Sequence, residues 1–268
     1  MVQVNEAAPR IKWATQSPDR VFVRFLTEPA AEFVINGAPL QCNEIVQLGR
    51  AQSYYEHTTG PMNWGGMSLS KEVAAETGIA LNGCDVFQHQ EPLRVIPELD
   101  AMARLGQIHS EAAALANVAP NILGEPEVVR SVEQSLIAAL FNCLSKRQVR
   151  RSPWAQRSHS AVMRRLRDTL ETHPDRALYV PEICVLIGVP ERTLRAYCQE
   201  QLGMGPKRYL SLRRMHLAHH ALCSVEPGTT TVTEVATRFG FWHFGRFAGN
   251  YRMVFGESPS ATLLAAPH

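Results

Sequence analysis

The sequence predicts an α+β protein in two parts, a small β-roll with helices followed by an all-helical part. The first observation is a series of short segments with period-two hydrophobicity in the first 70 residues, which is typical of strands. The second is a helix–glycine–helix pattern that occurs twice in the last 90 residues, with glycines at 188 and 240, an offset of 240 − 188 = 52. The third is charge. Residues 1–150 carry 12 Lys+Arg and 16 Asp+Glu, whereas residues 151–268 carry 15 and 9. We expect the second half to bind an anion, for which nucleic acid is the obvious candidate.

The expected strands are rich in β-branched and aromatic residues. They cover residues 21–26, 32–35 and 44–48, and the segments 52–56 and 62–69 extend the series. Turn residues such as Pro29, Gly37 and Gly49 separate them. Strands this short and evenly spaced favour a small barrel or jelly roll, although fewer are visible than a full roll needs.

Helical periodicity follows the strands. Ser70 is expected to cap a helix over 71–77 that Gly78 ends, and longer helices are expected over 98–116 and 127–146. The basic, proline-stopped segment 148–158 is interpreted as a linker between a first domain, 1–147, and a second, 159–268, whose first helix covers 159–172.

Several function classes have no support in the sequence. No run of eighteen apolar residues suggests a membrane span, and the N-terminus lacks a signal-peptide pattern. The six cysteines have no metal-ligand spacing, and Cys143, Cys184 and Cys198 fall on apolar helical faces, as buried hydrophobes do. We therefore expect a reducing cytoplasm, no membrane association and no disulfide. His57, His89 and His109 lack the spacing of a metal-dependent roll enzyme, so no metal, cofactor or catalytic residue is predicted.

The later of the two repeats lies between residues 232 and 260. Val232, Val235, Ala236 and Phe239 form one apolar helical stripe, and Gly240 follows where the chain must turn. A second stripe continues beyond the turn with Phe244, Phe247, Tyr251 and Phe255, and Arg246, Asn250 and Arg252 fall off it. Two amphipathic helices around a glycine are the plan of a helix-turn-helix.

The earlier repeat has the same plan around Gly188. Its second helix begins Pro190-Glu191-Arg192-Thr193-Leu194-Arg195 and is again polar and arginine-bearing. Both repeats end alike, with Leu202-Gly203-Met204-Gly205-Pro206 in the first and Phe255-Gly256-Glu257-Ser258-Pro259 in the second. An internal repeat of this kind predicts two helix-turn-helix units.

On these motifs, residues 178–263 resemble the DNA-binding domain of AraC/XylS-type bacterial transcription regulators. The matching segments are ERTLRAYCQEQLGMGPKRYLSLRRMHLAHHAL (191–222) and VTEVATRFGFWHFGRFAGNYRMVFGESPSATL (232–263). The resemblance implies seven helices, with two helix-turn-helix units joined by one long helix over about 206–223. It also implies a cupin-like roll ahead of them, here reduced, and a dimerisation role for the helical pair behind the roll. Simple packing of that pair against the sheet is the alternative.

The candidate DNA contacts lie on the second helix of each unit. Arginine pairs with guanine and threonine meets a thymine methyl, so Arg192, Thr193 and Arg195 are expected to read bases. By the family correspondence the other base-reading candidates are Phe244 and Arg246, and the phosphate contacts are His243, Asn250 and Arg252. Gly249 stands where the family usually has an arginine. With Gly245 and Gly249 both small, we expect the second helix to read few bases.

The resulting prediction is a sequence-specific transcription regulator, an activator that responds to a small molecule, and not an enzyme. Its expected partners are double-stranded promoter DNA, a small-molecule effector, RNA polymerase and a second copy of itself. Four aromatic residues of the roll are the effector-binding candidates: Phe22, Phe33, Tyr54 and Trp64. Aromatic rings in such positions more often belong to a plain core, which is the alternative interpretation. The alternatives are a constitutive DNA-binding protein with a vestigial roll, and a cupin-like enzyme or carrier with a basic helical domain.

Overall fold

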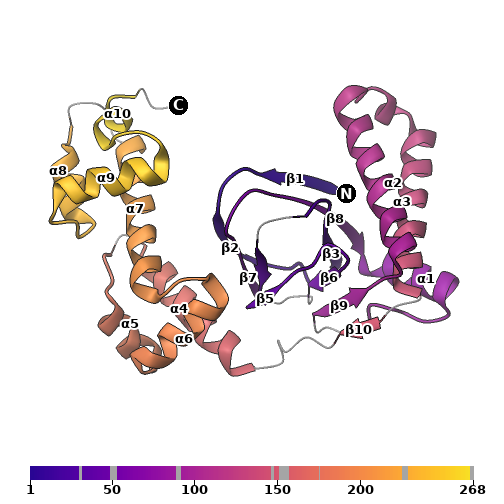
Figure 1. The fold of residues 1–268 in the computed structure, drawn as a ribbon, viewed down its shortest axis with the longest axis horizontal. Coiled ribbons are helices and arrows are strands. Elements are labelled where there is room, and N and C mark those ends of the chain that lie inside the picture. Colours follow the sequence, from indigo (N-terminus) through magenta and orange to yellow (C-terminus); the bar gives the residue numbers. More distant parts are fainter. Residues whose placement is uncertain are drawn as a thin grey trace. The chain divides into compact units, whose positions relative to one another are not determined.

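The structure is a computed structural model that describes residues 1–29, 32–48, 53–88, 92–145, 148–150, 157–174, 176–224 and 229–265. The chain divides into two compact units, Met1–Gln156 and Arg157–His268. We call them the roll unit and the helical unit. In Figure 1 the roll unit contains every strand, and the helical unit contains only helices.

The roll unit is built on two antiparallel sheets. A six-stranded sheet has the order β1-β8-β3-β6-β9-β10, and a four-stranded sheet has the order β2-β7-β4-β5. The strands of the larger sheet are β1 (Val2–Glu6), β8 (Met62–Ser70), β3 (Arg20–Leu26), β6 (Ile45–Leu48), β9 (Leu93–Ile96) and β10 (Gln148–Arg150). Those of the smaller sheet are β2 (Arg10–Thr15), β7 (Ser53–Thr58), β4 (Phe33–Ile35) and β5 (Ala38–Pro39).

Strand β3 shows how alternation builds two cores. Its odd-numbered residues, Val21, Val23 and Phe25, pack against the helices of the roll unit, together with Leu105 and Phe141. Its even-numbered residues face the interior of the roll, where Leu26 joins Phe33, Tyr54 and Trp64 in a second cluster. The β-rich fold predicted for this half is confirmed.

The roll has more strands than the periodicity revealed. The sequence analysis located β3, β4, β6, β7 and β8 but not β1, β2, β5, β9 or β10. Residues 148–150, expected to begin the linker, instead form β10, with Val149 opposite Val95 of β9. That expectation is corrected because this short segment gains its strand character from pairing with a segment about 50 residues away. In the rest of the expected linker, residues 151–156 lie outside the described residues, and residues 157–158 belong to the helix Arg157–Thr172.

Three helices accompany the roll: α1 (Lys71–Asn82), α2 (Leu99–Val118) and α3 (Pro126–Ser145). Helix α1 does not end at Gly78, as predicted, but at Gly83, whose φ is +73°. A Cβ on Gly78 would lie 2.9 Å from the carbonyl oxygen of Cys84, so this glycine allows close packing and does not end the helix. The α2–α3 pair packs on the sheet through residues such as Leu105, Leu136 and Leu140.

A buried ion pair lies in the interior of the roll. Arg24 of β3 is only 1% exposed and pairs with Glu56 of β7, itself 2% exposed, so the pair joins the two sheets. Lys12 lies 3.6 Å from the other oxygen of Glu56. The guanidinium also stacks on Trp64, with its carbon 4.0 Å from the ring centroid.

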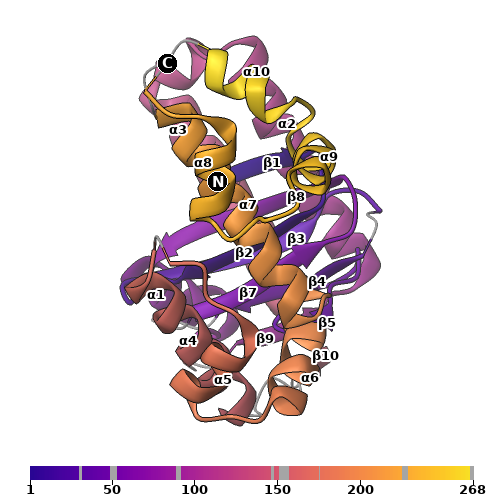
Figure 2. The ribbon, with the colours of Figure 1, turned by 90° about the vertical axis from the view of Figure 1, so that its left-hand side faces the viewer.

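The helical unit has seven helices in its described residues, the number that the AraC/XylS resemblance implies. They are α4 (Arg157–Thr172), α5 (Val180–Ile187), α6 (Glu191–Leu202), α7 (Pro206–Ser224), α8 (Val232–Arg238), α9 (Phe244–Phe255) and α10 (Pro259–Leu264). Figure 2 shows α4–α6 around one end of the long helix α7 and α8–α10 around the other.

The ion pair gives a stability prediction. Glu56→Gln leaves the Arg24 charge buried without its counter-charge, so we expect a loss of about 3–5 kcal/mol in the free energy of unfolding. Replacing both partners by apolar residues, Arg24→Met with Glu56→Leu, should recover most of that loss. The measurement is urea unfolding of the full chain followed by tryptophan fluorescence and circular dichroism. Asp19→Asn, which breaks an exposed pair with Lys71, is the matched control and should change little.

Candidate nucleic-acid interface

The second helix-turn-helix unit consists of α8, a glycine turn and α9. Thr231 caps α8 by accepting a hydrogen bond from the backbone nitrogen of Glu234, whose carboxylate accepts from the backbone of Thr231 in return. Val235, Ala236 and Phe239 are buried, as their stripe predicted. Gly240 then turns the chain with φ +76°, a conformation that costs other residues about 1–2 kcal/mol.

This turn is held by Arg214 of α7. Its guanidinium lies between two rings, 4.8 Å from the centroid of Tyr179 and 5.2 Å from that of Phe241. Its Nη1 donates to the carbonyl oxygen of Gly240 at 3.4 Å. Tyr179 directly precedes α5, so one side chain contacts both helix-turn-helix units. The Arg214 guanidinium therefore interacts through ring stacking and a carbonyl contact.

Helix α9 is seated on α7 and α10 through Tyr251. The Tyr251 hydroxyl donates to Oγ1 of Thr262 at 2.8 Å and lies 2.6 Å from Nδ1 of His219. Burial raises the pKa of Tyr251 to about 12, so the phenol keeps its proton and remains a donor at neutral pH. Phe247 packs beside it, with ring centroids 5.6 Å apart. The opposite side of α9 is thereby turned to solvent.

The first unit has the same organisation. Helix α5 ends at Gly188, with φ +68°, and α6 begins at Glu191. Leu194 and Cys198 are completely buried, whereas Arg192 and Arg195 are exposed and Thr193 is half-buried. The expected inward face of α6 is confirmed, and the three base-reading candidates lie on or beside its solvent face.

The two arginines of α6 differ in their contacts. Arg195 pairs with Glu191 one turn earlier, at 3.0 Å, with both side chains more than half exposed. Such a pair contributes little stability, so a phosphate or a base can compete for Arg195 at small cost. Arg192 has no hydrogen bond or ion pair within the described residues, so its guanidinium is available without rearrangement.

The candidates on α9 lie around its solvent side. His243, Phe244, Arg246 and Arg252 are exposed, and Asn250 is half-buried. Phe244 was expected both to continue the apolar stripe and to contact DNA. Its side chain is 43% exposed, so it does not belong to the core that holds Phe247 and Tyr251.

Two glycines on the same side of α9 are not required by the fold. Gly245 and Gly249 are one turn apart and exposed, and a Cβ added at either would meet no atom within 4 Å. Neither has a positive φ among the described residues. Glycine within a helix costs about 1 kcal/mol relative to alanine. Their small size therefore suits close approach of a partner better than any contact within the chain.

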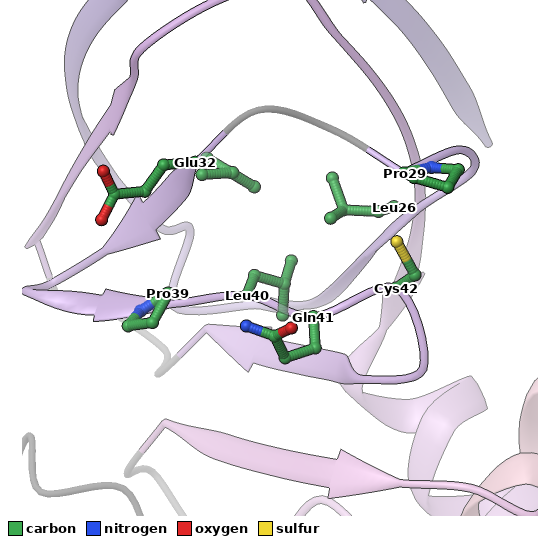
Figure 3. A pocket seen from close by; sticks show the side chains of 8 residues that line it. Leu26, Pro29, Glu32, Pro39, Leu40, Gln41 and Cys42 are labelled. Carbon is green, nitrogen blue, oxygen red and sulfur yellow. The ribbon is translucent and has the colours of Figure 1, made fainter.

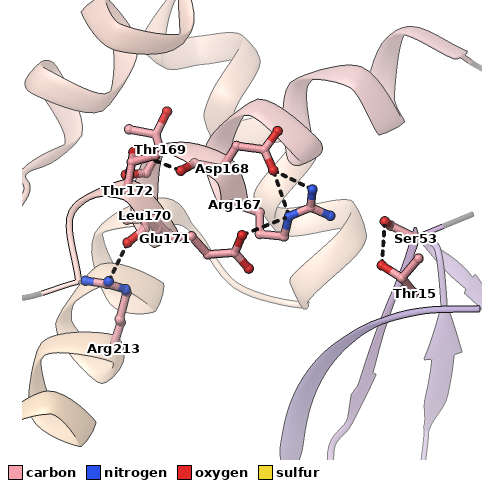
Figure 4. Close-up of polar contacts among 9 residues, drawn as sticks. All are labelled: Thr15, Ser53, Arg167, Asp168, Thr169, Leu170, Glu171, Thr172 and Arg213. Carbon is pink, nitrogen blue, oxygen red and sulfur yellow. Dashed lines mark hydrogen bonds and ion pairs between the residues drawn. The ribbon is translucent and has the colours of Figure 1, made fainter.

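The arginines of α4 and its neighbours serve packing. Arg213 of α7 donates to the carbonyl oxygen of Leu170 at 2.7 Å (Figure 4). Arg165 donates to that of Ile187 at 2.8 Å, and Arg167 pairs with Asp168 and Glu171. The Arg213 and Arg165 contacts join α4 to α7 and to α5, whereas the Arg167 pairs lie within α4.

The aromatic effector candidates converge on Arg24. Phe22, Phe33, Tyr54 and Trp64 all place their ring centroids within 6.0 Å of its guanidinium carbon. A pocket of about 370 Å³ opens at the rim of the roll (Figure 3). Phe33 is the effector candidate among its lining residues. Its other walls are Leu26, Pro29, Glu32, Pro39, Leu40, Gln41 and Cys42.

Three residues described in this subsection were not predicted from the sequence. Arg24 shares the alternation of Phe22 and Leu26, which places it inside the roll, but its pairing with Glu56 of the other sheet left no local signal. Tyr179 is likewise joined to Arg214 only by the fold. Trp242, between the glycine turn and α9, is 68% exposed and had not been selected.

Three cysteines were expected to be buried, and two of them are. Cys143 and Cys198 are buried, and burial raises the pKa of each thiol to about 12, whereas Cys184 is half-buried. In the described ranges no three His, Cys, Asp or Glu side chains gather as a metal site. No helix in those same ranges has the length and apolarity needed to cross a membrane.

The glycine turns give a prediction for the helical unit. Gly188→Ala should lower the free energy of unfolding by about 1–2 kcal/mol, from the positive φ alone, because no atom lies within 4 Å of the added Cβ. Gly240→Ala should lose about 1–2 kcal/mol more, because its Cβ would lie 2.6 Å from the Tyr179 hydroxyl and 2.9 Å from Nη1 of Arg214. Urea unfolding of both variants gives the comparison. Equal losses would show that Arg214 and Tyr179 do not hold the turn.

Comparisons with known proteins agree with this geometry. A family model described as "Helix-turn-helix domain" matches residues 183–265. The "Probable thc operon regulatory protein" of Rhodococcus erythropolis is 41% identical over 106 residues, which cover 40% of this chain and 32% of that protein. "XylDLEGF operon transcriptional activator 1" of Pseudomonas putida is 34% identical over 94 residues, which cover 35% of this chain and 28% of that protein.

The chain therefore spans less than a third of the length of these two relatives. Among solved structures, a probable AraC family transcriptional regulator from Rhodopseudomonas palustris is 31% identical, covering 38% of this chain and 94% of that one, with a TM-score of 0.34. The family model matches within the helical unit. This part of the chain is a helix-turn-helix domain of the AraC/XylS type.

Proposed function

We propose that the protein is a sequence-specific DNA-binding transcription regulator, an activator that responds to a small molecule. The observation that carries the proposal is the pair of helix-turn-helix units on one long helix, each with exposed cationic side chains on its second helix. In such units the second helix enters the major groove and its side chains reach base edges. The names of the two relatives, an operon regulatory protein and a transcriptional activator, support the same function.

The proposed contacts divide into base reading and backbone positioning. Arg192, Thr193 and Arg195 of α6 read bases through hydrogen bonds, with Phe244 and Arg246 contributing on α9. His243, Asn250 and Arg252 contact phosphates, which orient the protein without selecting a sequence. The exposure of both α6 arginines supports the first assignment, and the half-buried position of Asn250 makes it the least accessible of the second group.

The proposed effector site is the rim pocket of the roll. Its apolar lining from Leu26, Phe33 and Leu40, with Glu32 and Gln41 as polar groups, suits a small and mostly apolar molecule. The proposal includes RNA polymerase as a partner, a homodimer formed through α2 and α3, and a cytoplasmic location. It includes no catalytic step, because the sequence contains none of the catalytic patterns sought.

One observation favours a second candidate, a constitutive DNA-binding protein. Three of the four aromatic effector candidates do not line the rim pocket, and all four surround the Arg24–Glu56 pair in the interior of the roll. Thermal unfolding in the presence of a panel of small apolar compounds separates the two functions. Stabilisation by one compound supports the effector, whereas full binding and activation without any compound support the constitutive protein.

The test of DNA recognition is selection from randomised double-stranded DNA by the purified full chain. Recovery of one sequence with two separated conserved blocks supports the proposal. Recovery of unrelated sequences at equal affinity would contradict it, because a merely basic protein binds phosphates without selecting bases.

The same selection distinguishes the two classes of contact. Arg192→Ala should cost about 1–3 kcal/mol of binding free energy and relax the preference at one or two base positions. Arg252→Ala should weaken all sequences alike, because a phosphate contact carries no base information. If Arg252→Ala changes the base preference and Arg192→Ala leaves it intact, the two roles are assigned the wrong way round.

The α9 glycines separate stability from binding. Gly249→Ala should raise the free energy of unfolding by up to about 1 kcal/mol. It should also weaken DNA binding by about 1–3 kcal/mol, as an overpacked contact does. Gly106→Ala, within α2 and equally free of neighbours for its Cβ, is the matched control and should stabilise without affecting DNA binding. Unchanged DNA affinity of Gly249→Ala would show that the DNA does not approach this face.

A further inference from the structure

Two aromatic side chains project from the start of the second recognition helix. The chain turns at Gly240, and Phe241 packs inward, with its ring centroid 4.9 Å from that of Phe247 and 5.2 Å from the Arg214 guanidinium carbon. Because Phe241 is fixed inward, the next residue, Trp242, points outward and is 68% exposed. Phe244, in the first turn of α9, is 43% exposed.

Neither ring has a structural role that accounts for its position. Across the described ranges, Trp242 and Phe244 take part in no aromatic pair, cation–π contact or hydrogen bond. Two large apolar side chains exposed two residues apart in the chain, next to exposed arginines of α9, mark a contact site, because leaving them in water gains the fold nothing.

The surroundings identify the partner as DNA. Arg246 and Arg252 are exposed on the same helix, α9 contains no acidic residue, and His243 lies between the two aromatic residues. This surface therefore complements a polyanion, and it continues the helix-turn-helix surface proposed to enter the major groove. Gly245 and Gly249 offer neither donors nor acceptors from their side chains, so Arg246 is the long hydrogen-bonding side chain available on the central part of this face.

We propose that Trp242 and Phe244 read thymine through its 5-methyl group. In the major groove, base edges present hydrogen-bonding atoms and a single kind of apolar group, the thymine methyl. The thymine methyl is therefore the group in the major groove that an apolar ring can recognise, by packing against it and removing it from water. The inference rests on the proposed DNA-binding function and adds to it a class of target: A·T pairs in the half-site that contacts α9.

The test uses the selected DNA site with each thymine replaced singly by deoxyuridine, which removes the methyl group and keeps every hydrogen-bonding atom. Affinity for the full chain is measured by fluorescence anisotropy. At one or two thymines of the α9 half-site we expect about a fourfold loss, the effect of exposing one methyl group.

Trp242→Ala and Phe244→Ala should weaken binding to the thymine-containing site and abolish the deoxyuridine effect at those positions. Leu264→Ala removes another exposed apolar side chain, 75% exposed on α10, and should retain both the affinity and the effect. Arg192→Ala should bind more weakly yet keep the effect, because it reads the other half-site. Thermal unfolding of each variant checks that the fold is retained.

Three results would overturn the inference. No deoxyuridine effect at any thymine of the α9 half-site would show that methyl groups are not read. Variants that bind DNA normally but fail to activate transcription would assign the two rings to a protein partner. Absence of any sequence-specific binding by the unaltered chain would contradict the proposed function itself, and the thymine assignment with it.

Discussion

The arrangement of the two helix-turn-helix units depends on the position of Arg214. Its guanidinium is enclosed by Tyr179 on one side and Phe241 on the other, and it contacts the carbonyl oxygen of Gly240. Its Nε is buried and has no hydrogen-bond partner among the described residues, so the two flanking rings are a major part of its surroundings. Since Tyr179 belongs to the first unit and Phe241 to the second, a side chain of the connecting helix contributes to the relative position of both. Under the proposed function, two recognition helices positioned in this way would contact two base-pair blocks at a fixed separation.

A buried arginine is also central to the roll unit, where it and its neighbours fill the interior and leave little room for a ligand. Arg24 and Glu56 form an ion pair between the two sheets, and four aromatic rings surround the guanidinium. A buried pair of this kind contributes more to a defined arrangement than to net stability. The interior of the roll is consequently occupied by its own side chains, and the 370 Å³ pocket lies at the rim. An effector that displaced the ion pair would have to replace both of its charges, whereas one that used the rim would leave the pair intact.

The sequence predicted the helical unit well because its signals are local. The stripe through Val235, Ala236 and Phe239 lies within two helical turns, and Gly240 marks the turn by its own conformational freedom. Signals that depend on distant residues were missed or misread. Gly78 was taken to end α1, yet it permits close approach of Cys84, and β10 acquires its strand from pairing with β9. Arg24 has one local and one distant feature. Alternation along its strand places it inside the roll, but its partner Glu56 lies 32 residues away on another sheet. The outward position of Trp242 likewise follows from the inward packing of Phe241, which sequence alone does not show.

The two recognition helices are built for different chemistry, although they occupy equivalent positions in the repeat. Helix α6 presents arginines whose guanidinium groups can make paired hydrogen bonds, each able to discriminate bases by about 1–3 kcal/mol. Helix α9 presents glycines, an arginine and, at its start, two aromatic rings, so its capacity for hydrogen-bonded discrimination is small. Close approach nevertheless increases the number of backbone contacts, which add affinity for any sequence. Under the proposed function, α6 supplies most of the hydrogen-bonded selection of bases, and α9 adds apolar and positioning contacts. Arg214 connects the two units. In the proposed function, the two copies of the duplicated fold therefore contribute differently to DNA recognition.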